Sequence, residues 1–462
     1  MNKRMKVGIF FGGKSREREI SFAGGRTVYD NLDKRLFEPI PIFVDACNNL
    51  IQLHWRYLYK GTIRDFYIAD LSPLTTPTAA ADVASLPHTD IGPRLTLEAL
   101  KETIDVAFLA LHGPYGEDGS IQGMLDWLQI PYSGSGILGA AIGLDKVVQK
   151  QLMQAAGYCI TPYQVIARKQ WEDASLDKEK LLDSLIDTIG LPLVIKSPRQ
   201  GSSIGVHILT QRDVTAFATA VDHSFFRATL TAKDWKNFTE KEQALWLTQL
   251  ADCKTGIGLP LIVNSQRLHT SEQLLTYINA YFAEHDDTLS FDSLAGEACV
   301  LVEAFVAGRE FSCIVLQEIG EEPIVLPPTE IVKGELHFDY HAKYLPGLVR
   351  KETPMQLPAA QLAALQATCV SLFKDLHFQV YARIDGILCT DGQIYLNDPN
   401  TTAGMNPSSF LFHQAAEVGM NTSQLLTFVI RNSLAKHVAT YHAPPQVREL
   451  LQMVDDYLAQ PS

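Results

Sequence analysis

Four polar residues near the end of the chain have the types and spacing of a cation-binding site. They lie in RIDGILCTDGQIYLNDPNTTAG, which is predicted to form two strands joined by a two-residue turn at 391–392. This register sets Asp385 opposite Asp398. It also sets Arg383 opposite Asn400, and all four side chains project from one face because side chains alternate along a strand.

Two carboxylates that face each other repel and weaken a strand pair. A divalent cation between them would remove the repulsion, since Mg2+ prefers carboxylate and amide oxygens. Asp385, Asp398 and Asn400 would supply those oxygens, and Arg383 could stabilise a developing anion. The alternative is a different register, in which these residues are solvated polar side chains.

A second candidate site is the stretch LVIKSPRQGSSIGV at 193–206. A buried strand would deliver Lys196 to its end, and the small residues that follow would let backbone N–H groups approach a phosphate closely. Lysine supplies a point charge for such a phosphate. A plain hairpin loop is the alternative.

Further charged side chains lie where predicted strands end. His112 lies at the end of the strand predicted at 104–113 and Glu117 follows it, and α/β sheets bind ligands at such places. Glu303 ends an apolar strand and Glu310 follows after a glycine, so these carboxylates could receive the ribose hydroxyls or the adenine amine of a nucleotide. Solvated strand ends are the alternative for both.

The composition favours small-molecule substrates. The chain has 462 residues, 46% of them hydrophobic, which suggests two to four domains at roughly 100 to 200 residues each. A net charge of −13 argues against a nucleic-acid or anionic-membrane surface. Seven scattered cysteines without a CxxC pair indicate neither a disulfide framework nor a zinc site, so a reducing cytoplasm is expected. Neither a signal peptide nor a membrane span is expected.

Strands and helices alternate along the chain and must position these residues. KVGIFFGG and residues 104–113 are predicted strands that end in glycines, each followed by helical spacing, which is typical of a doubly wound α/β domain. Helices are predicted in 232–253 and 270–285, whereas 45–100 shows no firm period. Four parts are expected: an N-terminal α/β domain at 1–139 with an insertion at 45–100, a central α+β domain at 140–221, a helical insertion at 222–298 and a C-terminal domain at 299–462.

One rival motif lies at the N-terminus. GIFFGGKS formally matches the phosphate-binding pattern G-x-x-x-x-G-K-[ST] from Gly8 to Ser15. That motif needs a loop between its two glycines, but Ile9, Phe10 and Phe11 form the heart of the predicted strand. The match is interpreted as accidental.

Several separated motifs, taken in order, resemble the D-alanine:D-alanine ligases of the ATP-grasp superfamily. The resemblance covers most of the chain outside 45–100 and 222–298. It implies an ATP-grasp architecture, in which a doubly wound N-terminal α/β domain precedes two domains that clamp ATP between them. The motifs are GGKSREREIS, HGPYGEDGSIQG, IPYSGSG, LDK, VIKSPRQGSSIGV, VEAFVAGREF, FDYHAKY and ARIDGILCTDGQIYLNDPNTTAGMNPSSF.

The resemblance also implies a role for each matching residue. The residues expected to bind ATP are Lys146, Lys196, Gly201, Ser203, Glu303, Glu310 and Lys343. Those expected to hold two Mg2+ ions, or Mn2+, are Asp385, Asp398 and Asn400. The catalytic set would be Glu17, Ser202, Tyr344, Arg383 and Gly404, and the substrate-binding set His112, Glu117 and Ser409.

The implied reaction joins two D-alanine molecules, or similar D-amino acids, for peptidoglycan precursor synthesis. One carboxylate attacks the γ-phosphate of ATP to give an acyl phosphate, which the second amine then attacks. Tyr344 accompanies amine acceptors in this family. The expected partners are D-alanine, ATP and a second copy of the chain.

Three residues depart from the family's pattern. Asp398 replaces the usual glutamate, Pro399 an aliphatic residue and Ala403 a proline. Because proline cannot donate a ladder hydrogen bond, Pro399 is expected at a sheet edge or a strand end. Two alternatives therefore stay open: a nucleotide-binding homologue with weak or no ligase activity, and a ligase for a different amino-acid or hydroxy-acid acceptor.

Overall fold

The computed structural model describes residues 4–59, 91–333, 349–440 and 444–460. The chain divides into two compact units. Unit 1 comprises Met1–Tyr67, His88–Thr161 and Val306–Ser462, and the described part of unit 2 is Pro162–Phe305. Every helix among the described residues is too short or too polar to cross a lipid bilayer. The four domain boundaries expected from the sequence stay a prediction.

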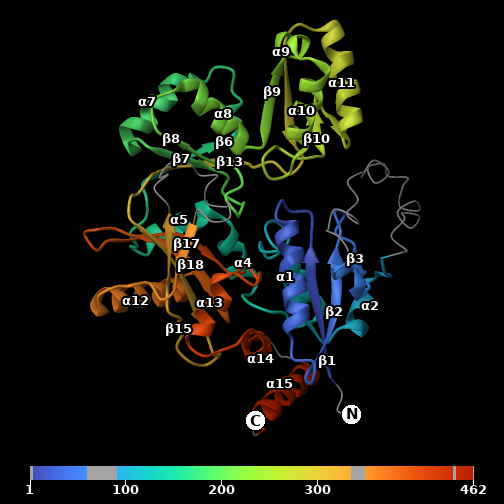
Figure 1. Ribbon diagram of the computed structural model, residues 1–462, viewed down its shortest axis with the longest axis vertical. Helices are drawn as coiled ribbons and strands as arrows, with labels where there is room; N and C mark the ends of the chain where they lie inside the picture. The colour runs from blue at the N-terminus through green and yellow to red at the C-terminus, as the bar shows by residue number, and fades with distance from the viewer. Residues whose placement is uncertain (1–3, 60–90, 334–348, 441–443, 461–462) are drawn as a thin grey trace. The chain divides into compact units, whose positions relative to one another are not determined.

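Unit 1 contains a five-stranded sheet in the order β4-β3-β2-β1-β5. Strands β1, β2 and β3 of this sheet are labelled in Figure 1. β1 pairs in parallel with β2 and β5, while β3 and β4 add an antiparallel edge built from the described parts of 45–100. The elements are β1 (Met5–Gly12), α1 (Arg18–Asn31), β2 (Phe37–Val44), β3 (Leu50–Gln52), the 3-10 helix η1 (Trp55–Leu58), β4 (Arg94–Leu95), α2 (Leu97–Thr103), β5 (Val106–Leu109), α3 (Ser120–Leu128), α4 (Ile137–Leu144) and α5 (Lys146–Ala155).

Both faces of this sheet are buried. Successive side chains of β1 point to opposite faces, and each set lies in a hydrophobic core. Val7 lies in one core with Phe22 of α1. Phe10 lies in a second core with Leu100 of α2 and Leu125 of α3. Helices therefore cover both faces of a parallel sheet, which is the doubly wound arrangement that the sequence predicted.

Strand β1 also decides the phosphate-loop match. Ile9, Phe10 and Phe11 are fully buried and pair with β2. The segment between the two glycines is a strand and not a loop, which confirms that the match is accidental.

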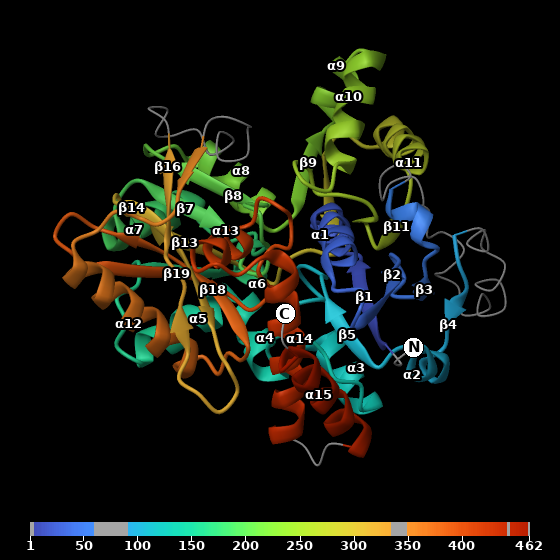
Figure 2. The same ribbon diagram turned by 60° about the horizontal axis from the view of Figure 1, so that its bottom comes forward.

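A second, six-stranded antiparallel sheet in unit 1 has the order β17-β16-β14-β18-β19, with β15 beside β14. Phe311 and Ile384 pack on Leu372 of α12 on one face, and Ile314 lies in the core of the other face. Helices α14 and α15 lie side by side in Figure 2. The elements are β14 (Arg309–Leu316), β15 (Ile324–Val325), β16 (Thr329–Lys333), β17 (Val349–Glu352), α12 (Ala359–Asp375), β18 (Tyr381–Leu388), β19 (Ile394–Asn400), α13 (Phe410–Glu417), α14 (Thr422–Thr440) and α15 (Pro445–Leu458).

Unit 2 begins and ends in a four-stranded antiparallel sheet with the order β6-β13-β7-β8. Ile195 of this sheet shares a core with Leu182 of α7 and Phe217 of α8. The elements are β6 (Tyr163–Ala167), α6 (Arg168–Trp171), α7 (Lys178–Ile189), β7 (Leu193–Lys196), β8 (Val206–Leu209), α8 (Val214–Ser224) and β13 (Cys299–Ala304).

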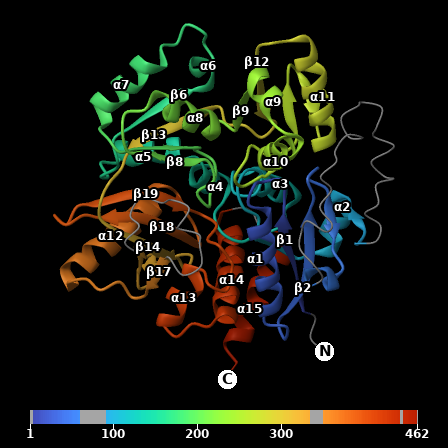
Figure 3. The same cartoon turned by 45° about the horizontal axis from the view of Figure 1, so that its top comes forward.

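The segment expected to be a helical insertion is an α+β subdomain, which corrects that prediction. Its antiparallel sheet has the order β11-β10-β12-β9, and α11 lies beside β12 in Figure 3. Helices occur in both predicted ranges, but the single helix predicted in 232–253 is broken into α9 and α10. Two of the four strands hold only three residues each, too few to show a period of two. The elements are β9 (Arg227–Thr231), α9 (Ala232–Asn237), α10 (Glu240–Ala251), β10 (Leu261–Val263), β11 (Gln266–Leu268), α11 (Ser271–Glu284) and β12 (Thr288–Ser293).

Candidate active site

The hairpin of β18 and β19 aligns the four polar residues as predicted. Asp385 pairs with Asp398, and Arg383 pairs with Asn400. Apolar residues of β18 alternate with these charges and are buried on the opposite face, so the polar side chains share one face.

The hairpin turn, however, is not the two-residue turn that was predicted. Cys389 pairs with Gln393 across a three-residue loop, in which the Gly392 N–H donates to the Cys389 carbonyl. The longer loop shifts the register by one residue. A bulge beside Gly386, where β19 holds Asn397 as an extra residue, shifts it back.

Both carboxylates of the hairpin have partners within the protein. The Ser312 hydroxyl, opposite on β14, donates to Asp385 Oδ1 at 2.7 Å, and an Arg383 Nη lies 3.0 Å from Asp385 Oδ2. Lys146 Nζ lies 3.2 Å from Asp398 Oδ1. The repulsion that suggested a cation is therefore partly balanced by the protein's own groups.

Lys146 is held at the start of α5. Asp145 caps this helix by accepting two backbone N–H groups of its first turn. Burial lowers the pKa of Lys146, but Asp398, Glu17 and Glu117 outweigh it and leave the pKa raised. The lysine therefore stays protonated, at a place where three carboxylates are near.

Glu17, His112 and Glu117 gather beyond the ends of β1 and β5. The Glu117 carboxylate accepts the Gly113 N–H at 2.5 Å and lies 3.7 Å from His112 Nδ1. Gly113 has a φ of +70°, and a Cβ added there would meet Ser15 at 3.0 Å. Glycine is therefore required where the loop bends past the segment that carries Glu17.

The electrostatics of His112 favour an anion beside it. Burial lowers its pKa, but the hydrogen bond and charge of Glu117 and the charge of Glu17 outweigh burial and raise the pKa. The Nε2 atom is buried and has no hydrogen-bond partner in the part of the chain that the structure describes. A protonated imidazole could donate from that atom to a carboxylate.

Four further site residues predicted from the sequence lie in unit 1, in different local environments. Asn400 donates its amide to the backbone carbonyl of Asp398 at 2.7 Å. Ser409 is the N-cap of α13 and accepts a backbone N–H of its first turn. Gly404 has open space where a Cβ would stand, and Glu310 is half-buried on β14.

Unit 2 holds the other predicted ATP residues. The Lys196 ammonium on β7 and the Glu303 carboxylate on β13 are buried and form an ion pair. These two groups were predicted to bind different ends of ATP, and here they neutralise each other. Two further candidates, Lys343 and Tyr344, lie outside the described residues.

The loop between β7 and β8 has an unusual backbone. Ser202 and Ser203 have φ values of 49° and 63°, in the left-handed region that L-residues rarely adopt. Gly205 has a φ of +68°, and a Cβ there would lie 2.2 Å from the Ser197 hydroxyl. The loop that begins at Gly201 is thus a tight turn with a defined shape.

Two neighbours of the candidate site were not predicted. Ser312 supports Asp385, and its signal was a polar residue in an apolar strand, two places after Glu310 and so on the same face. Gln149 of α5 is buried and donates to the carbonyl of Pro399 at 3.0 Å. A buried helical glutamine has no distinctive signal in a single sequence.

The oxygen atoms at the hairpin fit a hard cation. The side chains of Asp385 and Asp398 are 23% and 22% exposed, so both can reach a ligand. No cluster of three or more His, Cys, Asp or Glu residues with metal-binding geometry occurs within the described ranges. Two carboxylates and one amide suit Mg2+, which is usually held by few protein ligands together with substrate phosphates.

Solved structures define the class of fold. The chain aligns over 93% of its length with the whole of the VanG D-Ala:D-Ser ligase from Enterococcus faecalis, with a TM-score of 0.61 and 20% identity. It aligns over 95% with the whole of a D-alanine–D-alanine ligase from Bacillus anthracis complexed with ATP, with a TM-score of 0.56 and 23% identity. The protein therefore has the ATP-grasp fold, of mixed α/β and α+β character, as predicted.

Sequence comparisons define the family. Models described as D-ala D-ala ligase N-terminus and C-terminus match residues 6–135 and residues 152–227 and 224–431. A protein of Desulfotalea psychrophila named D-alanine–D-alanine ligase is 30% identical, over 94% of this chain and 96% of its own. The chain belongs to the D-alanine–D-alanine ligase family, a family of ATP-dependent ligases.

Proposed function

We propose that this protein uses ATP to join two D-alanine molecules for peptidoglycan precursor synthesis in the cytoplasm. The observation that carries the proposal lies in unit 1. Glu17 and Glu117, from the loops that follow β1 and β5, act electrostatically on Lys146, which is paired with Asp398 of the hairpin. Buried cations beside carboxylates at the meeting of two sheets suit a reaction between a carboxylate and a phosphate.

Relatives support the choice of reaction. Proteins named D-alanine–D-alanine ligase match nearly the full length of the chain, and a similar structure holds ATP. ATP is therefore the expected phosphoryl donor.

In the first step, a D-alanine carboxylate oxygen attacks the γ-phosphorus of ATP, and the bond to ADP breaks. Lys146 and Lys196 would offset the negative charge that gathers on the phosphates. The loop residues Gly201 and Ser203 would direct backbone N–H groups at the phosphates. Three further residues would contact ATP, Glu303 and Glu310 at its adenine and ribose and Lys343 at a phosphate.

In the second step, the amine of another D-alanine attacks the acyl carbon, phosphate leaves with the C–O bond electrons, and the proton lost by the nitrogen passes to this phosphate or to solvent. Arg383, aided by the Gly404 backbone, would stabilise the oxyanion of the tetrahedral intermediate. His112 would donate to the first D-alanine carboxylate, held in place by Glu117, and Ser409 would contact the second. Positioning of the amino acids would fall to Glu17, Ser202 and Tyr344.

Asp385, Asp398 and Asn400 would hold two Mg2+ ions, or Mn2+. When bound, these ions supply positive charge that reduces the repulsion between the incoming carboxylate and the phosphate oxygens. We further propose that the chain acts as a homodimer, which the family resemblance supports and light scattering would test.

The experiment that tests the function is phosphate release from Mg-ATP with D-alanine, D-serine, L-alanine, D-lactate or no acceptor, with products identified by mass spectrometry. Release that requires D-alanine and yields the dipeptide supports the proposal. A mixed product with D-serine would favour the alternative of a ligase with a different acceptor, since one similar structure is a D-Ala:D-Ser ligase. ATP binding without turnover with any acceptor would instead favour a homologue without ligase activity.

A further inference from the structure

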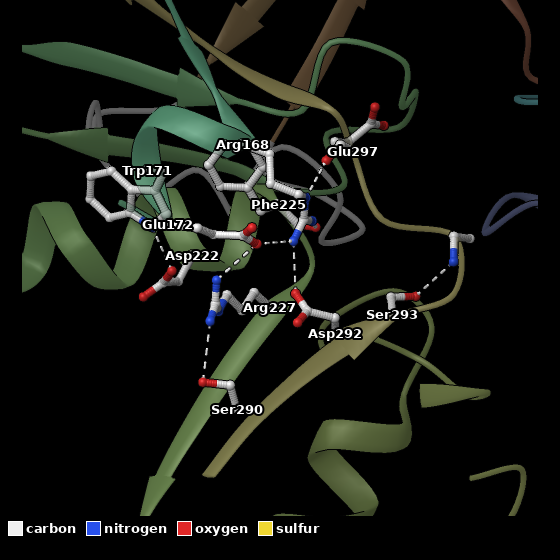
Figure 4. A network of polar contacts seen from close by, with 11 residues as sticks. Arg168, Trp171, Glu172, Asp222, Phe225, Arg227, Ser290, Asp292, Ser293 and Glu297 are labelled. Atoms are coloured by element: carbon white, nitrogen blue, oxygen red, sulfur yellow. Dashed lines mark hydrogen bonds and ion pairs between the residues drawn. The ribbon is translucent and has the colours of Figure 1, made fainter. Parts of the chain in front are cut away.

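Arg168 links the inserted subdomain of unit 2 to the central sheet (Figure 4). Its guanidinium donates to the carbonyl of Phe225, where the chain leaves the central sheet, at 2.6 Å. It also donates to the carbonyl of Glu297, where the chain returns, at 2.8 Å. The same group contacts Asp292 of β12 at 2.7 Å. Arg168 thus ties the exit and the return of the insertion together.

The carboxylate of Glu297, in contrast to its carbonyl, contacts residues of the β7–β8 loop. One carboxylate oxygen accepts from Gln200 Nε2 at 2.8 Å, and the other lies 3.2 Å from Arg199 Nε. This side chain is only 1% exposed, whereas that of Arg199 is 44% exposed. A buried carboxylate is tolerated when it is paired and hydrogen-bonded, and loss of a partner would leave its charge uncompensated.

Arg199 and Gln200 directly precede the strained part of the loop. Gly201 follows at once, and then Ser202 and Ser203 in the left-handed region. Such a backbone costs roughly 1–3 kcal/mol per residue and persists only where its surroundings fix it. The base of the loop is fixed by hydrogen bonds of Ser197 and Ser224, and its entry is fixed by Glu297.

We infer that Glu297 is a positioning residue, which holds the Gly201–Gly205 loop in the shape that receives the ATP phosphates. This inference rests on the proposed function for the role of the loop, but the contacts themselves do not. The insertion takes part through Arg168, because the bond from Arg168 to the Glu297 carbonyl fixes the backbone from which the carboxylate extends.

Glu297→Gln tests the inference, because it keeps the volume of the side chain but removes its charge and one acceptor. Hydrogen exchange of the loop amides, measured without nucleotide, should become faster than in the wild type. The Kd for a non-hydrolysable ATP analogue should rise about tenfold, the change expected for one charge-assisted hydrogen bond. The KM for D-alanine should change much less than the KM for ATP.

Glu172→Gln is the matched control. Glu172 accepts from Arg168 at 3.2 Å and from Arg227 at 2.9 Å, so it shares the junction but does not touch the loop. Its loop exchange and nucleotide affinity should equal those of the wild type. Arg199→Gln removes the charged partner of Glu297 at the exposed end of this contact. It replaces Glu297→Gln as the test if that variant fails to fold.

If hydrogen exchange of the loop amides were unchanged in both Glu297→Gln and Arg199→Gln, the inference would be overturned. Faster exchange with unchanged affinity would also overturn it, because the loop would then not be held for ATP. If the wild type bound no nucleotide, the proposed function would fail, and hydrogen exchange would still decide whether Glu297 holds the loop.

Discussion

The Oδ1 atom of Asp398 lies 3.2 Å from the Nζ atom of Lys146, which joins the edge strand of the C-terminal sheet to the first turn of α5. Lys146 is buried, and burial opposes its charge. Removal of one partner from a buried pair leaves the other uncompensated, which costs more than the net value of the pair. Two residues that lie far apart in the sequence are therefore coupled.

Lys146→Met should lower D-alanine-dependent phosphate release by roughly a hundredfold, since one charged group at a reacting phosphate contributes on that order. Steady-state kinetics would measure the loss. Lys236→Met is the control, because Lys236 pairs with Asp286 on an exposed surface, and its rate should match the wild type. Normal turnover in Lys146→Met would rule out a role at the phosphates.

Asp398→Asn should raise the Mg2+ concentration for half-maximal activity by at least about tenfold, because a cation loses one carboxylate. Titration of activity with Mg2+ after chelation would show the shift. Asp391→Asn provides a control on the same hairpin, since Asp391 is exposed in its loop. An equal effect of both substitutions would point to the hairpin fold and not to a metal site.

Glu117→Gln should lower the pKa of His112, because Glu117 provides the hydrogen bond and the largest charge that raise it against burial. The raised folded pKa stabilises the protein below the unfolded histidine pKa of about 6.5, and this stabilisation is lost as the pH rises through the folded pKa. The stability lost in Glu117→Gln should therefore be greatest at acidic pH. NMR titration of the imidazole, with His413 as an internal reference, would contradict the assignment if the His112 pKa did not fall.

Lys436 should make the protein less stable as the pH falls toward neutrality. Its burial lowers its pKa to about 7, although the charge of Asp126 acts in the opposite direction. Between about pH 10.4 and 7 the unfolded chain binds a proton that the folded chain does not, so the free energy of unfolding falls by up to about 4 kcal/mol. Denaturant unfolding would show this as a difference from Lys436→Met that grows from pH 10 to pH 7. A constant difference would mean that Lys436 stays charged, supported by its bond to the Gly134 carbonyl at 2.8 Å.

The facing carboxylates could be predicted from the sequence, but the path to them could not. A two-residue turn implied the pairing of Asp385 with Asp398, whereas the structure reaches it through a longer loop and a bulge at Asn397. The two differences cancel. A bulge has no signal in a single sequence, because it depends on the strand's neighbours.

The inserted subdomain shows a second limit of the sequence. Its helices α10 and α11 could be predicted because they hold 12 and 14 residues, but strands such as β10 and β11 are too short to display a period. The contacts of Glu297 also lay outside prediction, because its partners stand almost a hundred residues earlier. For Glu17, His112 and Glu117, local spacing placed two of them at a strand end, and only the family resemblance related them to Glu17.

Pro399 has a consequence for the solution behaviour of the protein. It lies in β19, the edge strand of its sheet, whose Leu396 N–H already donates to the carbonyl of Cys159. A proline has no N–H that could donate to an added strand, and the carbonyl of Pro399 already accepts a hydrogen bond from Gln149. The residue that departs from the family's pattern beside the candidate metal ligands thus leaves this part of the edge without an N–H with which a further strand could pair.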